Sequence, residues 1–110
     1  MSYLLDTTVA IDWSHAVPSA VDVVQRLFAE TDRLYTTDVI VCEALSGGTA
    51  QERDVIERFL GALEHVSLGP EGARAAGELR RSAGRAGPRS LADTLIAALA
   101  LQLDATIVTR

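Results

Sequence analysis

The sequence predicts an α/β fold in which helices cover both faces of a parallel sheet of about four strands. Short apolar runs alternate along the chain with longer segments whose apolar residues recur at helical spacing. This alternation is typical of parallel strands that are joined by crossover helices. The chain has 110 residues, 48% of them hydrophobic, and contains no internal repeat or low-complexity tract. Its length and composition match one domain with one core, spanning residues 1–110, and exclude a globally disordered chain.

Four short apolar runs predict the strands. They cover residues 3–5, 34–37, 65–68 and 106–109. The first run is followed by Asp6, whose carboxylate is expected to cap a helix that begins near Thr8. In folds of this class, ligands bind beyond the carboxyl ends of the strands. The residues that follow each strand are therefore the first place to search for a functional site.

Five longer segments have the apolar spacing of helices. They cover residues 18–30, 38–45, 49–63, 71–85 and 91–103. Pro18 or Ser19 suits the start of the first helix, and Asp38 is the expected N-cap of the second. The 71–85 segment is polar and rich in arginine, whereas 91–103 is apolar on nearly every face. We therefore expect the last helix to be buried at the centre of the fold.

Several classes of protein are excluded by the sequence. No apolar run reaches the ~18–20 residues that span a bilayer, and the N-terminus lacks the basic and apolar regions of a signal peptide. Cys42 is the single cysteine, so no internal disulfide forms and a cytoplasmic location is expected. The formal net charge is −5 and all ten basic residues are arginine. Binding of nucleic acid would therefore need a local arginine patch or a bound cation.

Three carboxylates stand out because they follow a predicted strand or lie in apolar helical segments. Asp6 comes directly after the first strand, Glu43 lies in the apolar stretch 39–45, and Asp93 stands near the start of the apolar last helix. Each has an ordinary structural explanation. Asp6 caps a helix, Glu43 pairs with a buried arginine, and Asp93 is favoured by the positive end of a helix dipole.

Taken together, the three carboxylates favour a metal site. Two carboxylates about 4 Å apart repel by about 4 kcal/mol at an effective dielectric constant near 20. Converging acids would have raised pKa values and would destabilise the fold unless a divalent cation neutralised them. Oxygen ligands select Mg²⁺ or Mn²⁺. His15 and His65 are isolated, so a zinc site is not indicated, and both are expected to be structural or surface residues.

Three motifs occur in order along the chain. YLLDTTVAID is a hydrophobic run followed by Asp-Thr, and VIVCEALSG places a glutamate in the helix after the second strand. LADTLIAALALQLDATIVTR, the most specific of the three, is an aspartate followed by Leu-Ile-Ala-Ala and then a strand ending in Thr-Arg. In order and spacing these motifs resemble those of the PIN-domain ribonucleases, and among them the VapC toxins of VapBC toxin–antitoxin modules. The resemblance covers essentially the whole chain.

The resemblance implies a three-layer α/β/α PIN-like fold and a metal-dependent endoribonuclease. Carried over residue by residue, the acidic site of the family falls on Asp6, Glu43 and Asp93, which would bind one or two Mg²⁺ or Mn²⁺ ions. A metal-activated water would hydrolyse phosphodiesters of RNA, often tRNA or ribosomal RNA, with no protein nucleophile. The resemblance also implies a VapB-type antitoxin, with a segment lying along a groove near the early helices, and a homodimer.

The chain departs from the family pattern in two places. Thr8 stands where the family usually has asparagine, and Thr7 or Thr8 is expected to offer a hydroxyl to the metal waters or to a neighbouring carboxylate. The family normally continues beyond Thr-Arg into a fourth acid and a final strand, whereas this sequence stops at Arg110. We therefore expect a PIN domain that is short at its C-terminus and lacks the last strand, with an exposed sheet edge. The alternative function is a catalytically silent PIN-like module that binds antitoxin or RNA without cleavage.

A group of arginines precedes Asp93 in the sequence. Its members are Arg80, Arg81, Arg85 and Arg89. They form either a solvated helix face or an edge that binds RNA phosphates beside the acidic site. Arginine suits the second role because its planar guanidinium binds phosphate through two hydrogen bonds.

Three further side chains have structural interpretations. Trp13 either covers the core or stands exposed on a partner surface, and the sequence does not separate the two. Cys42 is expected to be a core thiol beside Glu43. Asp12 is expected to be an ordinary surface charge.

Overall fold

A four-stranded parallel sheet forms the centre of the computed structural model, which describes residues 1–30, 33–84 and 90–110. The strands are β1 (Ser2–Leu5), β2 (Arg33–Thr36), β3 (Glu64–His65) and β4 (Thr106–Val108). Their order across the sheet is β3-β2-β1-β4, and every neighbouring pair is parallel. Leu4 of the central strand β1 is in register with Tyr35 of β2 and Ile107 of β4. The predicted parallel sheet of about four strands is confirmed.

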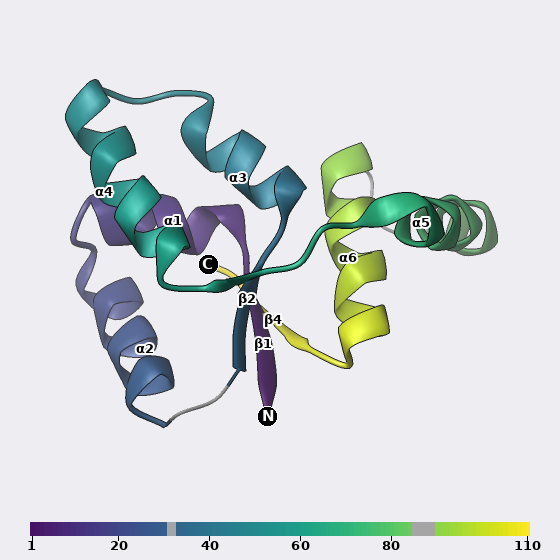
Figure 1. Cartoon of the computed structure of the whole chain (residues 1–110), viewed down its shortest axis with the longest axis horizontal. Helices are drawn as coiled ribbons and strands as arrows, with labels where there is room; N and C mark the ends of the chain where they lie inside the picture. The colour runs from purple at the N-terminus through teal and green to yellow at the C-terminus, as the bar shows by residue number, and fades with distance from the viewer. Residues whose placement is uncertain (31–32, 85–89) are drawn as a thin grey trace.

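Helices cover both faces of this sheet, as the sequence predicts. The helices of the described residues are α1 (Thr7–Ser14), α2 (Pro18–Ala29), α3 (Asp38–Leu45), α4 (Ala50–Gly61), α5 (Gly69–Ala83) and α6 (Leu91–Leu103). Figure 1 shows α1, α2 and α4 on one side of the sheet and α6 on the other, with α5 packed outside α6. None of the described helices combines the length and apolar character needed to cross a membrane.

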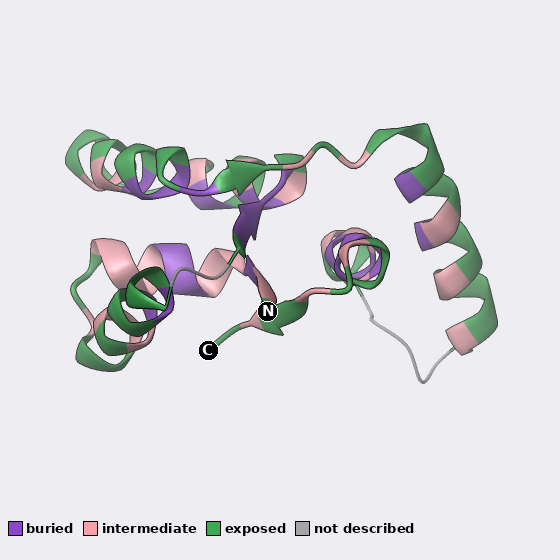
Figure 2. Ribbon diagram, turned by 60° about the horizontal axis from the view of Figure 1, so that its bottom comes forward, coloured by how far each residue is buried: buried purple, intermediate pink, exposed green. Residues whose placement is uncertain are grey.

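The core lies on both faces of β1. Leu4 and Leu5 are at most 1% exposed because helices pack on both sides of a parallel sheet. Ile40 of α3 and Leu99 of α6 bury their side chains against this centre from two different helices. Figure 2 shows the buried positions on the inward faces of the helices and the exposed positions on their outer faces.

Several predicted element boundaries differ from those of the structure, and two of the differences bear on local contacts. The third strand covers only Glu64–His65; the Val66 N–H still donates to the Thr36 carbonyl at 3.0 Å, and α5 begins at Gly69. Asp38 is the first residue of α3 rather than its N-cap, a position that Thr37 occupies. The Asp38 carboxylate instead bonds His65 Nε2 at 2.7 Å, which joins the start of α3 to the end of β3.

The prediction that the last helix is buried at the centre of the fold is confirmed for Thr94, Ile96 and Leu99, which are buried, but not for the whole helix. α6 contacts α3, α5, β1 and β4, and these neighbours leave Leu91 62% exposed and Leu101 72% exposed. Cys42 is likewise exposed and is not a core thiol. On α3 the buried residues are Ile40 and Ala44, and Cys42 lies about 200° around the helix from Ile40, since successive residues are about 100° apart.

Two buried threonines differ in the hydrogen bonding of their hydroxyl groups, so replacing each with valine should change the free energy of unfolding in opposite directions. The Thr36 hydroxyl is buried at the end of β2 with no hydrogen-bond partner among the described residues, whereas the Thr94 hydroxyl donates to the Ser90 carbonyl at 2.9 Å. Thr36→Val keeps the side-chain shape and removes an unpaired polar group, so we expect the free energy of unfolding to rise by about 1 kcal/mol. Thr94→Val should lower it by about 1 kcal/mol because a hydrogen bond is lost.

Urea denaturation of the two valine variants beside the wild type tests this contrast. Equal destabilisation of both variants would contradict the prediction, because it would mean that the Thr36 hydroxyl is paired in solution.

Candidate active site

Asp6 occupies the carboxyl end of the central strand and the N-cap of α1. Its Oδ1 accepts the Thr7 N–H at 2.8 Å, and its own N–H donates to the Val108 carbonyl of β4 at 2.9 Å. The carbonyl of Asp6 accepts the first backbone bonds of α1, so the residue is held from both sides. The prediction that Asp6 caps the helix is confirmed.

Thr7 connects Asp6 to Glu43. The Thr7 hydroxyl, on the first residue of α1, donates to Glu43 Oε1 of α3 at 2.8 Å. A hydroxyl has a single proton, so Thr7 occupies one of the two acceptor positions of Glu43 Oε1 and leaves the other position open. The structure thus brings two of the three predicted acids together at the carboxyl ends of β1 and β2, through one threonine.

The second oxygen of Asp6 is bonded through a chain of hydroxyl groups. Thr109 Oγ1, just after β4, donates to Asp6 Oδ2 at 3.1 Å, and Thr8 Oγ1 lies 3.2 Å from Thr109 Oγ1. Since Thr109 uses its only proton on the carboxylate, Thr8 is the donor to Thr109. Thr8 in turn accepts the N–H of Arg110 at 3.1 Å. The relay therefore runs from Arg110 N–H through two hydroxyls to Asp6, and bonds in such a chain polarise one another.

Asp93 lies in the first turn of α6, where its N–H donates to the Ser90 hydroxyl that caps the helix. Its side chain is exposed. A shallow apolar groove of about 370 Å³ separates the start of α6 from α3; its lining includes Glu43 and Leu91. Figure 1 shows the starts of α3 and α6 at the same end of the sheet as the carboxyl ends of β1 and β2.

The donor set and its spacing can be compared with what a metal ion needs. Asp6, Glu43 and Asp93 offer only oxygen atoms, which suit Mg²⁺ or Mn²⁺. Within residues 1–30, 33–84 and 90–110, however, no three His, Cys, Asp or Glu side chains are grouped so that they could hold an ion. Asp6 and Glu43 are near one another through Thr7, and Asp93 is not grouped with them.

The predicted arginine group is only partly described by the structure. Arg80 and Arg81 are exposed in the last turn of α5, the helix that packs outside α6. Arg85 and Arg89 lie outside the described residues.

The two histidines and Trp13 take structural positions. His15 Nε2 is 2.8 Å from Glu52 Oε2, and this bond, with help from Thr49, lowers the pKa of Glu52 below its usual 4.5. Both histidines are exposed and each bonds a carboxylate, His65 that of Asp38. Trp13 is half-buried and stacks on Phe59 of α4, with ring centroids 5.5 Å apart.

Two side-chain interactions at the end of β4 were missed by the sequence analysis. Thr109 was assigned to a strand, and only the pairing of β4 with β1 places its hydroxyl on Asp6. Asp12 was expected to be an ordinary surface charge, but its side chain is only 14% exposed and pairs with Arg110. The hydrogen bond and charge of Arg110 lower the pKa of Asp12, and the same pair raises the pKa of Arg110.

Known proteins provide an independent comparison for this fold. The model of the PIN domain family matches residues 3–110. The chain is 30% identical over 108 residues to Ribonuclease VapC19 of Mycobacterium tuberculosis. The aligned region covers 96% of this chain and 86% of that protein.

Among solved structures, the chain resembles a DNA-bound VapBC of Salmonella typhimurium with a TM-score of 0.82 and 26% identity, over 99% of this chain and 86% of that one. It also resembles VapBC2 of Rickettsia felis bound to a promoter DNA fragment, with a TM-score of 0.83, 23% identity, and coverage of 99% and 87%. The matched family model and the relative cover nearly the whole chain. The chain therefore belongs to the PIN-domain family, among its VapC-type members.

Proposed function

We propose that this protein is a Mg²⁺- or Mn²⁺-dependent endoribonuclease that acts as the toxin of a toxin–antitoxin module. The observation that carries the proposal is the pair of carboxylates Asp6 and Glu43, joined by Thr7 at the carboxyl ends of β1 and β2. Ligand sites of α/β folds lie at this edge of the sheet. The relative named a ribonuclease adds the reaction class.

The carboxylate oxygens of Asp6 and Glu43 are donors that suit a hard divalent cation. Asp6 and Glu43 would hold it, and Asp93 would join them from the first turn of α6. When bound, such an ion activates water and stabilises charge on the phosphodiester undergoing hydrolysis. The chain's own groups orient the ligands: Thr7 holds Oε1 of Glu43, while the Thr7 N–H and the Thr109 hydroxyl each hold one oxygen of Asp6. An ionised carboxylate oxygen has two acceptor positions, so each of these oxygens keeps one for a cation.

The substrate and partners belong to the same proposal. The substrate is RNA, of the tRNA or ribosomal RNA class, and the arginine group contacts its phosphates, with Arg80 and Arg81 exposed on α5. The partner is a VapB-type antitoxin, consistent with solved neighbours that are VapBC and toxin–antitoxin complexes. The protein acts in the cytoplasm as a homodimer.

Cleavage of a mixed tRNA and ribosomal RNA pool tests the metal requirement. We expect cleavage in Mg²⁺ or Mn²⁺, loss of cleavage in EDTA, and recovery when excess Mn²⁺ is restored. The recovery step is the control that EDTA has not damaged the protein or the RNA. Cleavage that continues in EDTA would contradict the metal-dependent mechanism.

One observation favours a second candidate, a silent module that binds antitoxin or RNA without cleavage. The described residues do not group three acids around one cation position. Antitoxin binding by a chain that leaves RNA intact at every metal concentration would support this candidate. Cleavage by the same chain would exclude it.

A further inference from the structure

We propose that Arg110 and Asp12 are positioning residues that fix the orientation of Asp6 through the end of β4. This inference rests on the proposed role of Asp6 in holding a divalent cation. Neither residue is proposed to touch the metal or the RNA. They act by holding the segment that carries Thr109, the hydroxyl donor to Asp6.

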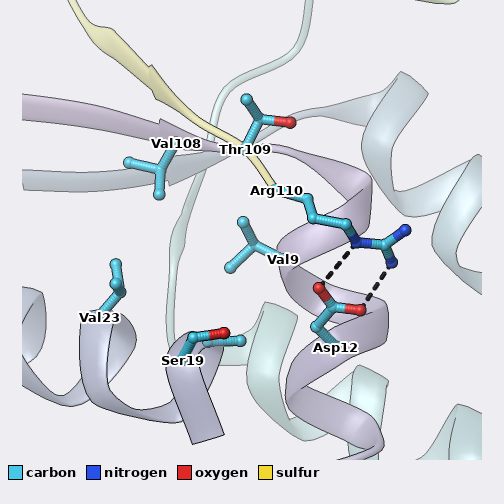
Figure 3. A pocket seen from close by; sticks show the side chains of 8 residues that line it. Val9, Asp12, Ser19, Val23, Val108, Thr109 and Arg110 are labelled. Carbon is cyan, nitrogen blue, oxygen red and sulfur yellow. Dashed lines mark hydrogen bonds and ion pairs between the residues drawn. The ribbon is translucent and has the colours of Figure 1, made fainter. Parts of the chain in front are cut away.

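The ion pair has the geometry of a strong charge-assisted contact. Arg110 Nε donates to Asp12 Oδ2 at 3.0 Å, and Nη2 donates to Oδ1 at 2.6 Å. Figure 3 shows the guanidinium reaching from the end of β4 to Asp12 on α1 with these two bonds side by side. Bidentate pairs of this kind constrain direction as well as distance, more than a single-point contact does.

The pair lies on the same helix face as the relay to Asp6. Thr8 and Asp12 are four residues apart on α1, so their side chains are neighbours along one face. Arg110 contacts both of them, Thr8 through its backbone N–H at 3.1 Å and Asp12 through its side chain. A rotation of Arg110 away from α1 would therefore break the first link of the relay that ends on Asp6.

Polar contacts, and not apolar packing, hold the end of β4 in place. A cavity of about 250 Å³ lies beside the pair, between α1, α2 and the end of β4; its lining includes Val9, Val23 and Val108 (Figure 3). Thr109 and Arg110 are exposed. Because apolar packing does not enclose these two residues, the bidentate pair is the contact best placed to hold them.

A positioning role and an RNA-contact role make different predictions for Arg110. Two N–H groups of its guanidinium are already bonded to Asp12, whose charge offsets its own. If Arg110 only positions Thr109, its loss weakens metal binding and lowers kcat while KM for RNA stays constant. If it instead binds RNA phosphate, KM rises and metal affinity is unchanged.

The test compares Arg110→Gln, Arg110→Lys and Asp12→Asn with the wild type. For each protein, Mn²⁺ affinity is measured by electron paramagnetic resonance without RNA, and kcat and KM are measured on one RNA substrate. We expect Arg110→Gln and Asp12→Asn to lose about tenfold in Mn²⁺ affinity and in kcat, the lower end of the range seen when a direct hydrogen-bond partner of a metal ligand is removed, because both residues act through Thr109. The Mn²⁺ affinity and kcat of Arg110→Lys should lie between those of the wild type and Arg110→Gln, because lysine keeps the charge but cannot form the bidentate contact.

Arg33→Gln is the matched control. It removes another arginine–carboxylate pair, that of Arg33 with Glu64 at 3.2 Å, which joins β2 to β3 away from α1. It should leave Mn²⁺ affinity and kcat unchanged, and thermal melting should show that every variant is folded. If Arg110→Gln and Asp12→Asn keep the Mn²⁺ affinity and kcat of the wild type, or raise only KM, the inference is overturned and the proposed function stands. A wild type that neither cleaves RNA nor binds Mn²⁺ would overturn the proposed function, and the inference with it.

Discussion

Asp6→Asn is expected to lower RNA cleavage by more than about a hundredfold while the protein remains folded. The substitution removes the negative charge that would hold the cation, and loss of one preorganised electrostatic group costs about a hundredfold or more in rate. Asparagine caps helices about as well as aspartate, so its side-chain oxygen still accepts the Thr7 N–H at the start of α1. We therefore expect the free energy of unfolding to change by at most about 1 kcal/mol.

Asp22→Asn provides the matched control for charge. Asp22 is an exposed aspartate on α2, and its substitution makes the same change in net charge away from the proposed site. Single-turnover cleavage at saturating Mg²⁺ and a urea denaturation curve should be measured for both variants. If Asp6→Asn cleaves RNA at the Asp22→Asn rate, Asp6 is not part of the active site.

Leu99→Ala is expected to lower the free energy of unfolding by about 2–5 kcal/mol. Leu99 is 2% exposed and belongs to the central core, so truncation removes buried apolar surface and leaves a cavity. A loss of this size is a large fraction of the ~5–15 kcal/mol that stabilises a typical domain. The measurement is urea denaturation followed by circular dichroism.

Leu101→Ala is the control on the same helix. Leu101 is only two residues away, yet it is 72% exposed, so the same truncation should change the free energy of unfolding by no more than about 0.5 kcal/mol. Similar losses for the two variants would mean that α6 is buried on both faces in solution, for example in an oligomer.

The candidate site shows how far sequence reasoning reached and where it stopped. Asp6 was recognised because it directly follows an apolar run, a local signal that also predicted its role as a helix cap. The contact of Thr7 with Glu43 joins residues 36 positions apart, and that of Thr109 with Asp6 joins residues 103 apart. No local sequence pattern predicts either of these two contacts. They follow from the parallel pairing of β1 with β2 and β4 and from the packing of α1 on α3.

The same distinction explains the predictions that were wrong. Cys42 and Leu101 are apolar residues in apolar segments, so composition placed them in the core. Whether a position on an apolar helix is buried depends on which neighbours cover that face, and here the neighbours of α3 and α6 leave both residues exposed. Hydrophobic residues are commonly exposed on folded proteins, so apolar character alone does not decide burial.

The sequence by itself determined the α/β class and the order of its elements, and it predicted the acids that carry the proposed chemistry. It did so because alternating apolar patterns and helix signals act over a few residues, and because the motifs are contiguous. Only the tertiary structure decided that Thr8 and Thr109 form a relay to Asp6 and that Arg110 bonds Asp12. These contacts arise where β4 pairs with β1 and ends against α1, and such long-range packing fixes geometry that local sequence cannot specify.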